Sequence, residues 1–361
     1  MPGIETTGRL GFLGLLCVAA LAAAQPMPPA APRVTITVWQ QVNERCRALA
    51  VEPLPPYPWP VAPFDRQHPV RGYFGDPRTV ISGDGEGAYS FHNGIDISAW
   101  TGNHVYPVVS GTVTKVSFDR IVVHTADGRR FQYIHVAPRV HAGSYVVASR
   151  TLLGTIRPGW NHVHLSEIRD GCAVNPLAPG HLTPYVDTTR PSVERILFEN
   201  AARKPLPPLE LSGQVQVVAE ASDEPALANP FPWGSVPVAP ALVRWTLETL
   251  SGRVVTGGTA ADFRFSEPPR SQFCQVYAPG TEQNFAAVVG TFHWGKPGRY
   301  LYELTPSLDT GRLRRGRYRL TVSAADTAGN MGLRTTLIAV SDRALTFVPA
   351  PAPDHRCAVS S

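Results

Sequence analysis

The sequence predicts a mostly β protein of about two domains, built from antiparallel strands. Proline and glycine are abundant, at 36 and 31 of 361 residues, and proline at this frequency disfavours long helices because its ring removes a backbone donor and clashes with the preceding turn. A hydrophobic share of 43% and a net charge of only +5 argue against a disordered chain. Short β-branched runs separated by glycine turns are typical of hairpins and indicate a β protein.

Residues 1–24 have the features of a secretory signal. Arg9 is followed by the apolar stretch Leu10–Leu21 and by Ala22-Ala23-Ala24, which suits signal-peptidase cleavage. The apolar stretch is too short to span a bilayer, and no other segment is long and apolar enough. We therefore expect an exported protein without a transmembrane span, located in the periplasm, the cell envelope or the extracellular space.

Cleavage after Ala24 would remove Cys17 and leave four cysteines. An even number in an exported chain fits two disulfides, for which three connectivities are open. The sequence contains no C-x-x-C pair, which disfavours a zinc–thiolate site. The four remaining cysteines are Cys46, Cys172, Cys274 and Cys357.

The positive net charge favours anionic surroundings, and cell-wall polymers are one such partner for an exported protein. An incidental surplus of basic residues on a solvated surface is the alternative. The sequence has neither an uninterrupted basic run nor a platform of aromatic and basic residues, so we expect no nucleic-acid partner.

Residues 25–65 form a proline-rich N-terminal segment. It begins with a Pro/Ala linker at 25–32, and the alternation in Val34–Trp39 predicts a strand. The prolines of Pro53–Pro63 prevent a helix there. This stretch could either cross a cleft or attach the N-terminal segment to the surface of the domain. Whether residues 25–65 act as a propeptide stays open.

Residues 66–188 are predicted to form a compact β domain with short strands at 108–109, 112–116, 121–123 and 145–147. Residues 189–345 are predicted to form a second β domain, followed by a tail at 346–361. The second domain's expected strands lie at 215–219, 242–247, 299–303, 318–324 and 333–340.

The stretch GRYRLTVSAADTAGN, at Gly316–Asn330, resembles the penultimate strand and turn of immunoglobulin-like and fibronectin-like modules. The resemblance implies an immunoglobulin-like β-sandwich for the second domain.

Histidines cluster in the first domain at spacings that suggest a metal site. His162 and His164 lie two apart in a strand-like context, so their side chains project from the same face. Two imidazoles with a carboxylate are an ordinary zinc ligand set that leaves one position open for catalysis. Asp96 is a candidate for the carboxylate and His92 for a further imidazole.

These residues lie in segments that resemble a known family. FHNGIDI resembles the H-x-G-x-D-I motif of lysostaphin-type (LytM-like) zinc metalloendopeptidases, which cut peptidoglycan peptides. NHVHLSEI resembles that family's P-H-L-H-F-E-I segment, YIHV its Y-x-H-L, and VYPVVSGTV its V-Y-A-x-x-D-G-x-V strand. The segments occur in the family's order over about a third of the chain.

The resemblance implies a peptidase domain of antiparallel sheets, like the duplicated hybrid motif, that binds Zn²⁺. It implies that Gly94 gives the tight backbone between two ligands, and that His124 has a structural or supporting role. The implied zinc ligands are His92, Asp96 and His164, and the implied catalytic imidazoles are His135 and His162.

The chain departs from the family pattern at several positions. Ser166 is an extra residue before Glu167, and we expect it to bulge the strand after the metal ligand. Asn161 replaces the usual proline before H-x-H, and Pro107 and Ser110 replace the family's alanine and aspartate. These changes affect the expected substrate fit more than metal binding.

The expected function is hydrolysis of peptide bonds in peptidoglycan cross-links or stem peptides. The chain has no H-E-x-x-H motif, so a glutamate base on a helix is not expected. Zinc would activate a bound water molecule. One of the two imidazoles, His135 or His162, would accept the proton of that water, and the other would stabilise the oxyanion. The sequence does not indicate which histidine has which role. Two alternatives remain: a non-catalytic relative that binds wall peptide or regulates another hydrolase, and a secreted protease acting on glycine-rich proteins.

Overall fold

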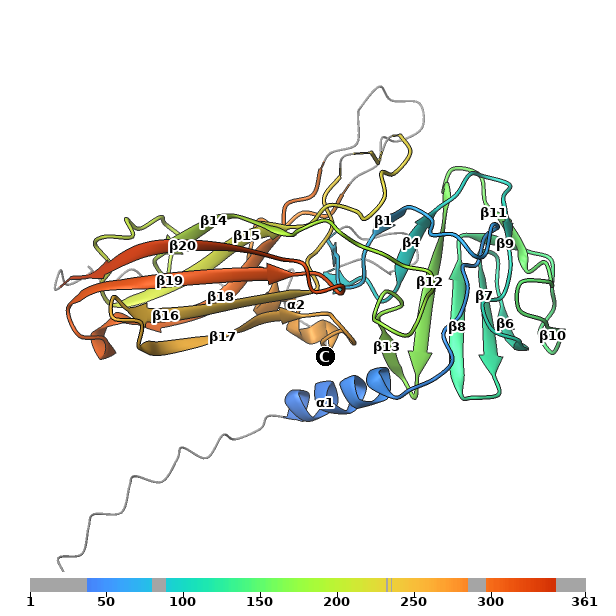
Figure 1. Ribbon diagram of the computed structural model, residues 1–361, viewed down its shortest axis with the longest axis horizontal. Coiled ribbons are helices and arrows are strands. Elements are labelled where there is room, and N and C mark those ends of the chain that lie inside the picture. Colours follow the sequence, from blue (N-terminus) through green and yellow to red (C-terminus); the bar gives the residue numbers. More distant parts are fainter. Residues whose placement is uncertain (1–37, 80–88, 232, 235, 285–296, 342–361) are drawn as a thin grey trace, which may run out of the picture. The chain divides into compact units, whose positions relative to one another are not determined.

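The computed structural model describes residues 38–79, 89–231, 233–234, 236–284 and 297–341 (Figure 1). The described chain is mostly β, and all pairings between its named strands are antiparallel. The expected signal segment, the 25–32 linker and the 346–361 tail lie outside these residues. In the described part, no helix is both long and apolar enough for a membrane crossing.

The prediction of a strand at 34–39 is wrong for its two described residues, Val38 and Trp39. They begin helix α1 (Val38–Val51). The helix contains no proline and includes several good helix formers (glutamine, glutamate, arginine, alanine and leucine). Their propensity outweighs the short alternation that precedes them.

Helix α1 is attached to the first domain by a disulfide and by a buried arginine. Cys46 is bonded to Cys172, with their Cα atoms 5.4 Å apart. The Nη1 group of Arg169 donates to the carbonyl oxygens of Leu49 (2.8 Å) and Glu52 (3.0 Å), which the helix end leaves without helical partners. Cys274 is also disulfide-bonded, whereas Cys17 and Cys357 lie outside the described residues.

The proline-rich segment after α1 is part of the core rather than a strap over a cleft. Tyr57 and Trp59 are 1% and 0% exposed. Tyr57 forms an isolated bridge with Leu182, and Nε1 of Trp59 donates to the carbonyl oxygen of Pro184 (2.8 Å). As expected from its prolines, Pro53–Pro63 contains no helix.

The first predicted domain, residues 66–188, contains an eight-stranded sheet in the order β1-β4-β12-β8-β7-β6-β10, with β13 paired to β12 (Figure 1). Strand β12 therefore lies between β4 and β8. The strands are β1 (Val70–Gly72), β4 (Ile95–Ser98), β6 (Gly111–Val116), β7 (Arg120–Thr125), β8 (Arg129–Ile134), β10 (Tyr145–Val146), β12 (His162–Arg169) and β13 (Cys172–Val174).

Two smaller sheets complete this domain. One has the order β5-β11-β9 and the other pairs β2 with β3. The strand expected at 108–109 is absent, because the backbone N–H of Val108 donates to the Tyr133 hydroxyl (2.8 Å) instead of joining a ladder. The strands are β2 (Pro77–Arg78), β3 (Ser90–Phe91), β5 (His104–Val105), β9 (Val136–Pro138) and β11 (Gly154–Ile156).

The bulge expected at Ser166 is also wrong. Strand β12 pairs with β8 in unbroken register, with Ser166 opposite Gln132 and His164 opposite Ile134. Ser166 therefore continues the alternation of the strand, on the same face as His164.

The described residues of the second predicted domain contain two sheets, in the orders β14-β15-β18 and β17-β16-β19-β20. Strands occur where the sequence predicts them, although β18 begins at Leu301 rather than Arg299. The elements are β14 (Ser192–Glu199), β15 (Gln214–Ser222), β16 (Leu242–Thr249), β17 (Val254–Asp262), η1 (Arg270–Gln272), α2 (Phe273–Val276), β18 (Leu301–Asp309), η2 (Thr310–Arg312), β19 (Gly316–Ala325) and β20 (Met331–Val340).

Buried hydrogen bonds join the turn between β1 and β2 to the second domain. Oδ1 of Asp76 accepts from the Ala239 backbone N–H (2.7 Å), and the Tyr277 hydroxyl donates to the Gly75 carbonyl oxygen (2.7 Å). Gly75 has a φ of 87°, and a Cβ there would lie 2.3 Å from the ring of Phe263. The turn therefore needs glycine both for its backbone conformation and for close packing.

Candidate active site

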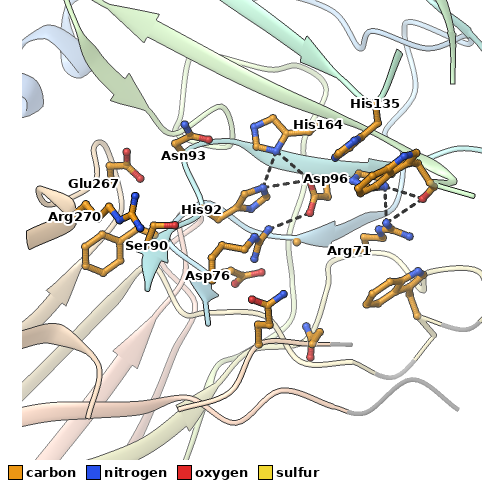
Figure 2. Close-up of a pocket in the computed structure, with 18 of the residues that line it drawn as sticks. Arg71, Asp76, Ser90, His92, Asn93, Asp96, His135, His164, Glu267 and Arg270 are labelled. Atoms are coloured by element: carbon orange, nitrogen blue, oxygen red, sulfur yellow. Dashed lines mark hydrogen bonds and ion pairs between the residues drawn. The ribbon is translucent and has the colours of Figure 1, made fainter. Parts of the chain in front are cut away.

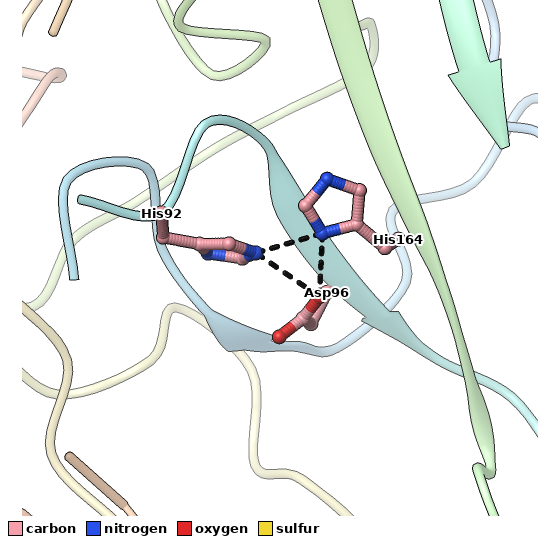
Figure 3. A group of neighbouring side chains, drawn as sticks. All are labelled: His92, Asp96 and His164. Atoms are coloured by element: carbon pink, nitrogen blue, oxygen red, sulfur yellow. Dashed lines mark hydrogen bonds and ion pairs between the residues drawn. The ribbon is translucent and has the colours of Figure 1, made fainter. Parts of the chain in front are cut away.

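Three neighbouring segments of the first domain bring His92, Asp96 and His164 together (Figure 3). His92 follows β3, Asp96 lies in β4, and His164 lies opposite Asp96 in β12. Nε2 of His92 is 2.9 Å from Nδ1 of His164. Oδ1 of Asp96 is 3.2 Å from each of these nitrogens.

Hydrogen bonds on the far side of each imidazole orient the two rings. Nδ1 of His92 lies 2.9 Å from the Tyr73 carbonyl oxygen, which can only accept, so this nitrogen carries the proton and Nε2 presents a lone pair. Nε2 of His164 lies 2.7 Å from Oγ of Ser166. With Ser166 as the acceptor, Nδ1 of His164 presents its lone pair to the same centre.

This donor set fits zinc. Ligand atoms bound tetrahedrally at about 2.0–2.1 Å lie about 3.3 Å from one another, close to the 2.9–3.2 Å separations here. Two imidazole lone pairs and a carboxylate oxygen repel one another unless a cation lies between them. The backbone at Gly94 is as tight as expected, because a Cβ there would lie 2.4 Å from the Leu165 carbonyl oxygen and 2.6 Å from Nε2 of His164.

The charges around Asp96 favour its ionised form. Burial alone would raise its pKa, but the interactions with His92 and His162, which favour the carboxylate whenever either ring is protonated, hold the pKa of Asp96 well below its usual value. Nη2 of Arg78 donates to Oδ2 of Asp96 (3.1 Å), which leaves Oδ1 for the ligand centre. Burial, followed by the charge of Arg78, lowers the pKa of His92 to about 3, so His92 is neutral at pH 7.

His162, two residues before His164 in β12, is oriented by Trp160 and Arg71. Nδ1 of His162 lies 2.8 Å from the Trp160 carbonyl oxygen and 2.5 Å from Nη2 of Arg71. Both cannot be conventional hydrogen bonds, because the first needs a proton on Nδ1 and the second needs a lone pair. We assign the proton to Nδ1, since Arg71 also donates to the Trp160 carbonyl oxygen (3.0 Å) and keeps a partner there. Nε2 of His162, 3.4 Å from Oδ1 of Asp96, is then the basic nitrogen.

His135 lies between β8 and β9, in a left-handed backbone conformation with φ 66°. Such a conformation is uncommon for a non-glycine residue. Its ring stacks on Trp160 and lies 4.6 Å from the ring of His162, centroid to centroid. Burial, followed by the charge of His162, lowers the pKa of His135 to about 2, so this imidazole is neutral at pH 7.

His124 does not belong to this group. It is exposed on β7, opposite Thr112 of β6, and it is not among the residues that line the pocket described next. The supporting role expected for it is therefore wrong, because its strand position points its side chain to solvent.

The five histidine and aspartate side chains line a pocket of about 470 Å³ (Figure 2), a size typical of ligand sites. Several of its residues have no counterpart in the sequence prediction. From the first domain these include Arg71, Arg78 and Trp160, and from the second domain Trp233, Glu267, Arg270, Gln283 and Asn284. The second domain therefore forms one wall of the pocket, which no local sequence pattern indicates.

Comparison with known proteins gives partial likenesses. No family profile matches the chain, and no curated protein matches it. A zinc-containing peptidase from Vibrio cholerae is 22% identical over 33% of this chain and 39% of its own, with a TM-score of 0.27. The catalytic domain of a mutant of EnpA, a prophage-encoded M23 protein from Enterococcus faecalis, is 27% identical over 34% of this chain and 97% of its own, with a TM-score of 0.26.

A chain of the SpoIIQ–SpoIIIAH pore-forming complex is 25% identical over 34% of this chain and 89% of its own, with a TM-score of 0.27. All these TM-scores are low, so these likenesses carry no argument about function. A functional proposal has to rest on the residues of the site itself.

Proposed function

We propose that the protein is a zinc metalloendopeptidase with His92, Asp96 and His164 as the metal ligands. The observation that carries the proposal is the approach of Nε2 of His92, Nδ1 of His164 and Oδ1 of Asp96 to within 3.2 Å of one another. Three protein ligands leave one tetrahedral position for water or substrate, as in catalytic zinc sites. When bound, zinc supplies Lewis acidity and lowers the pKa of water from 15.7 towards about 7.

His162 is the proposed general base. The Trp160 carbonyl holds its proton on Nδ1, so Nε2 can accept a proton from the attacking water. The carboxylate of Asp96, 3.4 Å from Nε2, favours the imidazolium that results. The same group then returns the proton to the leaving amine.

His135 is the proposed oxyanion stabiliser. It is neutral because of burial, and no hydrogen bond or ion pair between described residues joins it to a carboxylate. A neutral imidazole retains one N–H donor, and a donor beside His162 suits the charge that develops on the scissile carbonyl.

The proposed substrates are peptides of the bacterial cell wall, cut after export of the chain. Support comes from the family-like motifs and from a pocket lined by hydrogen-bonding side chains, among them Arg270, Gln283 and Asn284, which suits a peptide. We further propose a peptidase domain at 66–188 and an immunoglobulin-like domain at 189–345. The strand orders β14-β15-β18 and β17-β16-β19-β20 support the second assignment.

Two histidine variants test the assignment of roles. The His164→Ala protein should lose zinc, measured as metal content after dialysis. The His162→Ala protein should keep zinc and lose hydrolysis of purified wall material, measured by turbidity clearing and by release of free amines. His124→Ala is the matched control, because this exposed histidine should affect neither measurement. Unchanged turnover in the His162 variant would contradict the assignment of His162 as the general base.

The same assay separates the alternatives. Stoichiometric zinc with no cleavage of any wall peptide would favour a wall-binding or regulatory protein. Cleavage of a glycine-rich protein but not of wall fragments would favour a secreted protease with protein substrates.

A further inference from the structure

A second group of metal-ligating side chains, none of them in the histidine site, lies where the β13–β14 connection meets the ends of β15 and β19. Asp187 lies in the connection between β13 and β14, Asp223 directly follows β15, and Asp326 directly follows β19. One carboxylate oxygen from each lies within 4.8 Å of the other two. The three residues are 6%, 2% and 4% exposed.

No cationic side chain compensates these three carboxylates in the described part of the chain, where none of the ion pairs includes any of them. Asp187 accepts from the Tyr185 hydroxyl (2.9 Å) and the Thr189 N–H (2.9 Å). Asp326 accepts from the backbone and side-chain N–H groups of Asn330 (2.8 and 2.7 Å). All these donors are neutral, so the cluster is left with several like charges in a buried place.

Asp223 gives a separate indication of a missing partner. Its Oδ1 accepts from the Glu224 N–H (2.8 Å). Its other carboxylate oxygen, Oδ2, is buried and has no hydrogen-bond partner, an arrangement that costs free energy unless a ligand satisfies it.

We propose that Asp187, Asp223 and Asp326 bind a calcium ion. Calcium takes carboxylate oxygens at about 2.3–2.6 Å, so two oxygens on one ion are at most about 5 Å apart, and the cluster meets this limit. The all-oxygen donor set suits a hard cation and not zinc, which prefers nitrogen and sulfur ligands. Backbone carbonyls and water can supply further ligands.

The proposed ion would join the β13–β14 connection to the ends of β15 and β19, and hydrogen bonds link this connection to the histidine site. The Tyr185 hydroxyl bonds both to Asp187 and to the Tyr73 hydroxyl (3.2 Å). The Tyr73 hydroxyl accepts from the Ala226 N–H (2.9 Å). The backbone carbonyl oxygen of Tyr73 accepts from Nδ1 of His92. Calcium would therefore stabilise the connection between β13 and β14. Through Tyr185 and Tyr73, this connection contacts the segment that orients His92.

The test uses the full mature chain, saturated with zinc and dialysed against calcium-free buffer. Thermal unfolding is measured with and without CaCl₂, and bound calcium is counted by titration calorimetry. We expect one site per chain and a rise in Tm of about 5–10 °C at a calcium concentration about 100 times Kd. No calcium binding to the native chain would overturn the proposal, as would an equal response to MgCl₂ alone.

The decisive variant is Asp223→Asn, which keeps the side chain's size and removes one charge. It should lose the rise in Tm with calcium, and in calcium-free buffer it should be at least as stable as the native chain because repulsion is relieved. The matched control is Asp309→Asn, which lies at the far end of the β15–β18 pair and should keep the response. His164→Ala should also keep it, so failure of the zinc assignment and failure of the calcium site are distinguishable. A calcium response in Asp223→Asn equal to that of the native chain would refute the assignment.

Discussion

The imidazole of His135 stacks on the indole of Trp160, with ring centroids 3.6 Å apart and 11° between the ring planes. The carbonyl oxygen of Trp160 also accepts from Nδ1 of His162. One residue therefore orients both proposed catalytic imidazoles, one through its ring and the other through its backbone.

Replacement of Trp160 separates these two contributions. Trp160→Ala keeps the backbone carbonyl and removes the stacking surface, so His135 loses its orientation while His162 keeps its partner. We expect kcat to fall by up to about 100-fold, as for other small displacements of catalytic groups, with zinc content unchanged. Trp160→Phe should recover much of the activity because a ring remains.

The control for this measurement is Trp100→Ala, since Trp100 is 59% exposed and does not line the same pocket. A change in KM with no change in kcat would contradict the positioning role of Trp160 and would indicate a role in substrate binding instead.

Ser166 should tune the affinity for zinc. Its Oγ lies 2.7 Å from Nε2 of His164 and sets which nitrogen of that ring faces the ligand centre. Ser166→Ala removes this partner, and the loss of such an outer hydrogen bond typically weakens metal affinity by about 10–100-fold. Competition with a chromogenic zinc chelator measures the change. Thr112→Ala, an exposed position on β6, is the control, and unchanged affinity in Ser166→Ala would show that the serine does not select the tautomer.

The candidate site illustrates what local sequence can and cannot predict. His92 and Asp96 fall in one short motif and His162 and His164 in another, so their spacing alone suggests a shared site. At Asn161 the sequence shows only a departure from the family's proline. Its φ of 50° explains it, because proline cannot adopt a positive φ whereas asparagine tolerates it.

Residues that reach the site through tertiary contacts left no such signal. Arg71 meets His162 from a segment without a recognised motif, 91 residues away in the sequence, and Glu267 comes from the C-terminal part of the chain. Helix α1 is a different case, because its propensity is local and the alternation in Val34–Trp39 conceals it. Packing between distant segments determines only where Arg71 and Glu267 lie.

Glu267 should make stability depend on pH. Its Oε2 is buried without a hydrogen-bond partner, and burial raises the pKa of this carboxyl from 4.5 to about 8. The folded chain therefore keeps a proton that the unfolded chain loses above about pH 4.5. The resulting stability is fully present below that pH and is lost as pH rises towards 8, by up to about 1.4 kcal/mol per pH unit.

Glu267→Gln removes the titration and keeps the shape of the side chain. We expect the native chain to become progressively less stable than the variant between pH 5 and pH 8, measured by urea unfolding of both zinc-loaded proteins at each pH. Taking the difference between the two cancels the pH dependence of zinc binding. A constant difference across this range would contradict the raised pKa.

The disulfide between Cys46 and Cys172 should stabilise the fold without supporting the metal site. It closes a loop with a sequence separation of 126 residues, and removing a crosslink over a loop of that length typically costs about 2–5 kcal/mol by freeing the unfolded chain. We expect this loss in the double variant Cys46→Ala, Cys172→Ala, measured by denaturant unfolding.

Zinc content should be unchanged in the double variant. Cys172 lies in β13, which pairs with the Glu167–Arg169 end of β12, whereas His162 and His164 lie at the other end of that strand. The Arg169 side chain still holds the carbonyl groups at the end of α1, so the helix retains a second attachment. A parallel loss of zinc and stability would mean that the helix and the metal site fold as one cooperative unit.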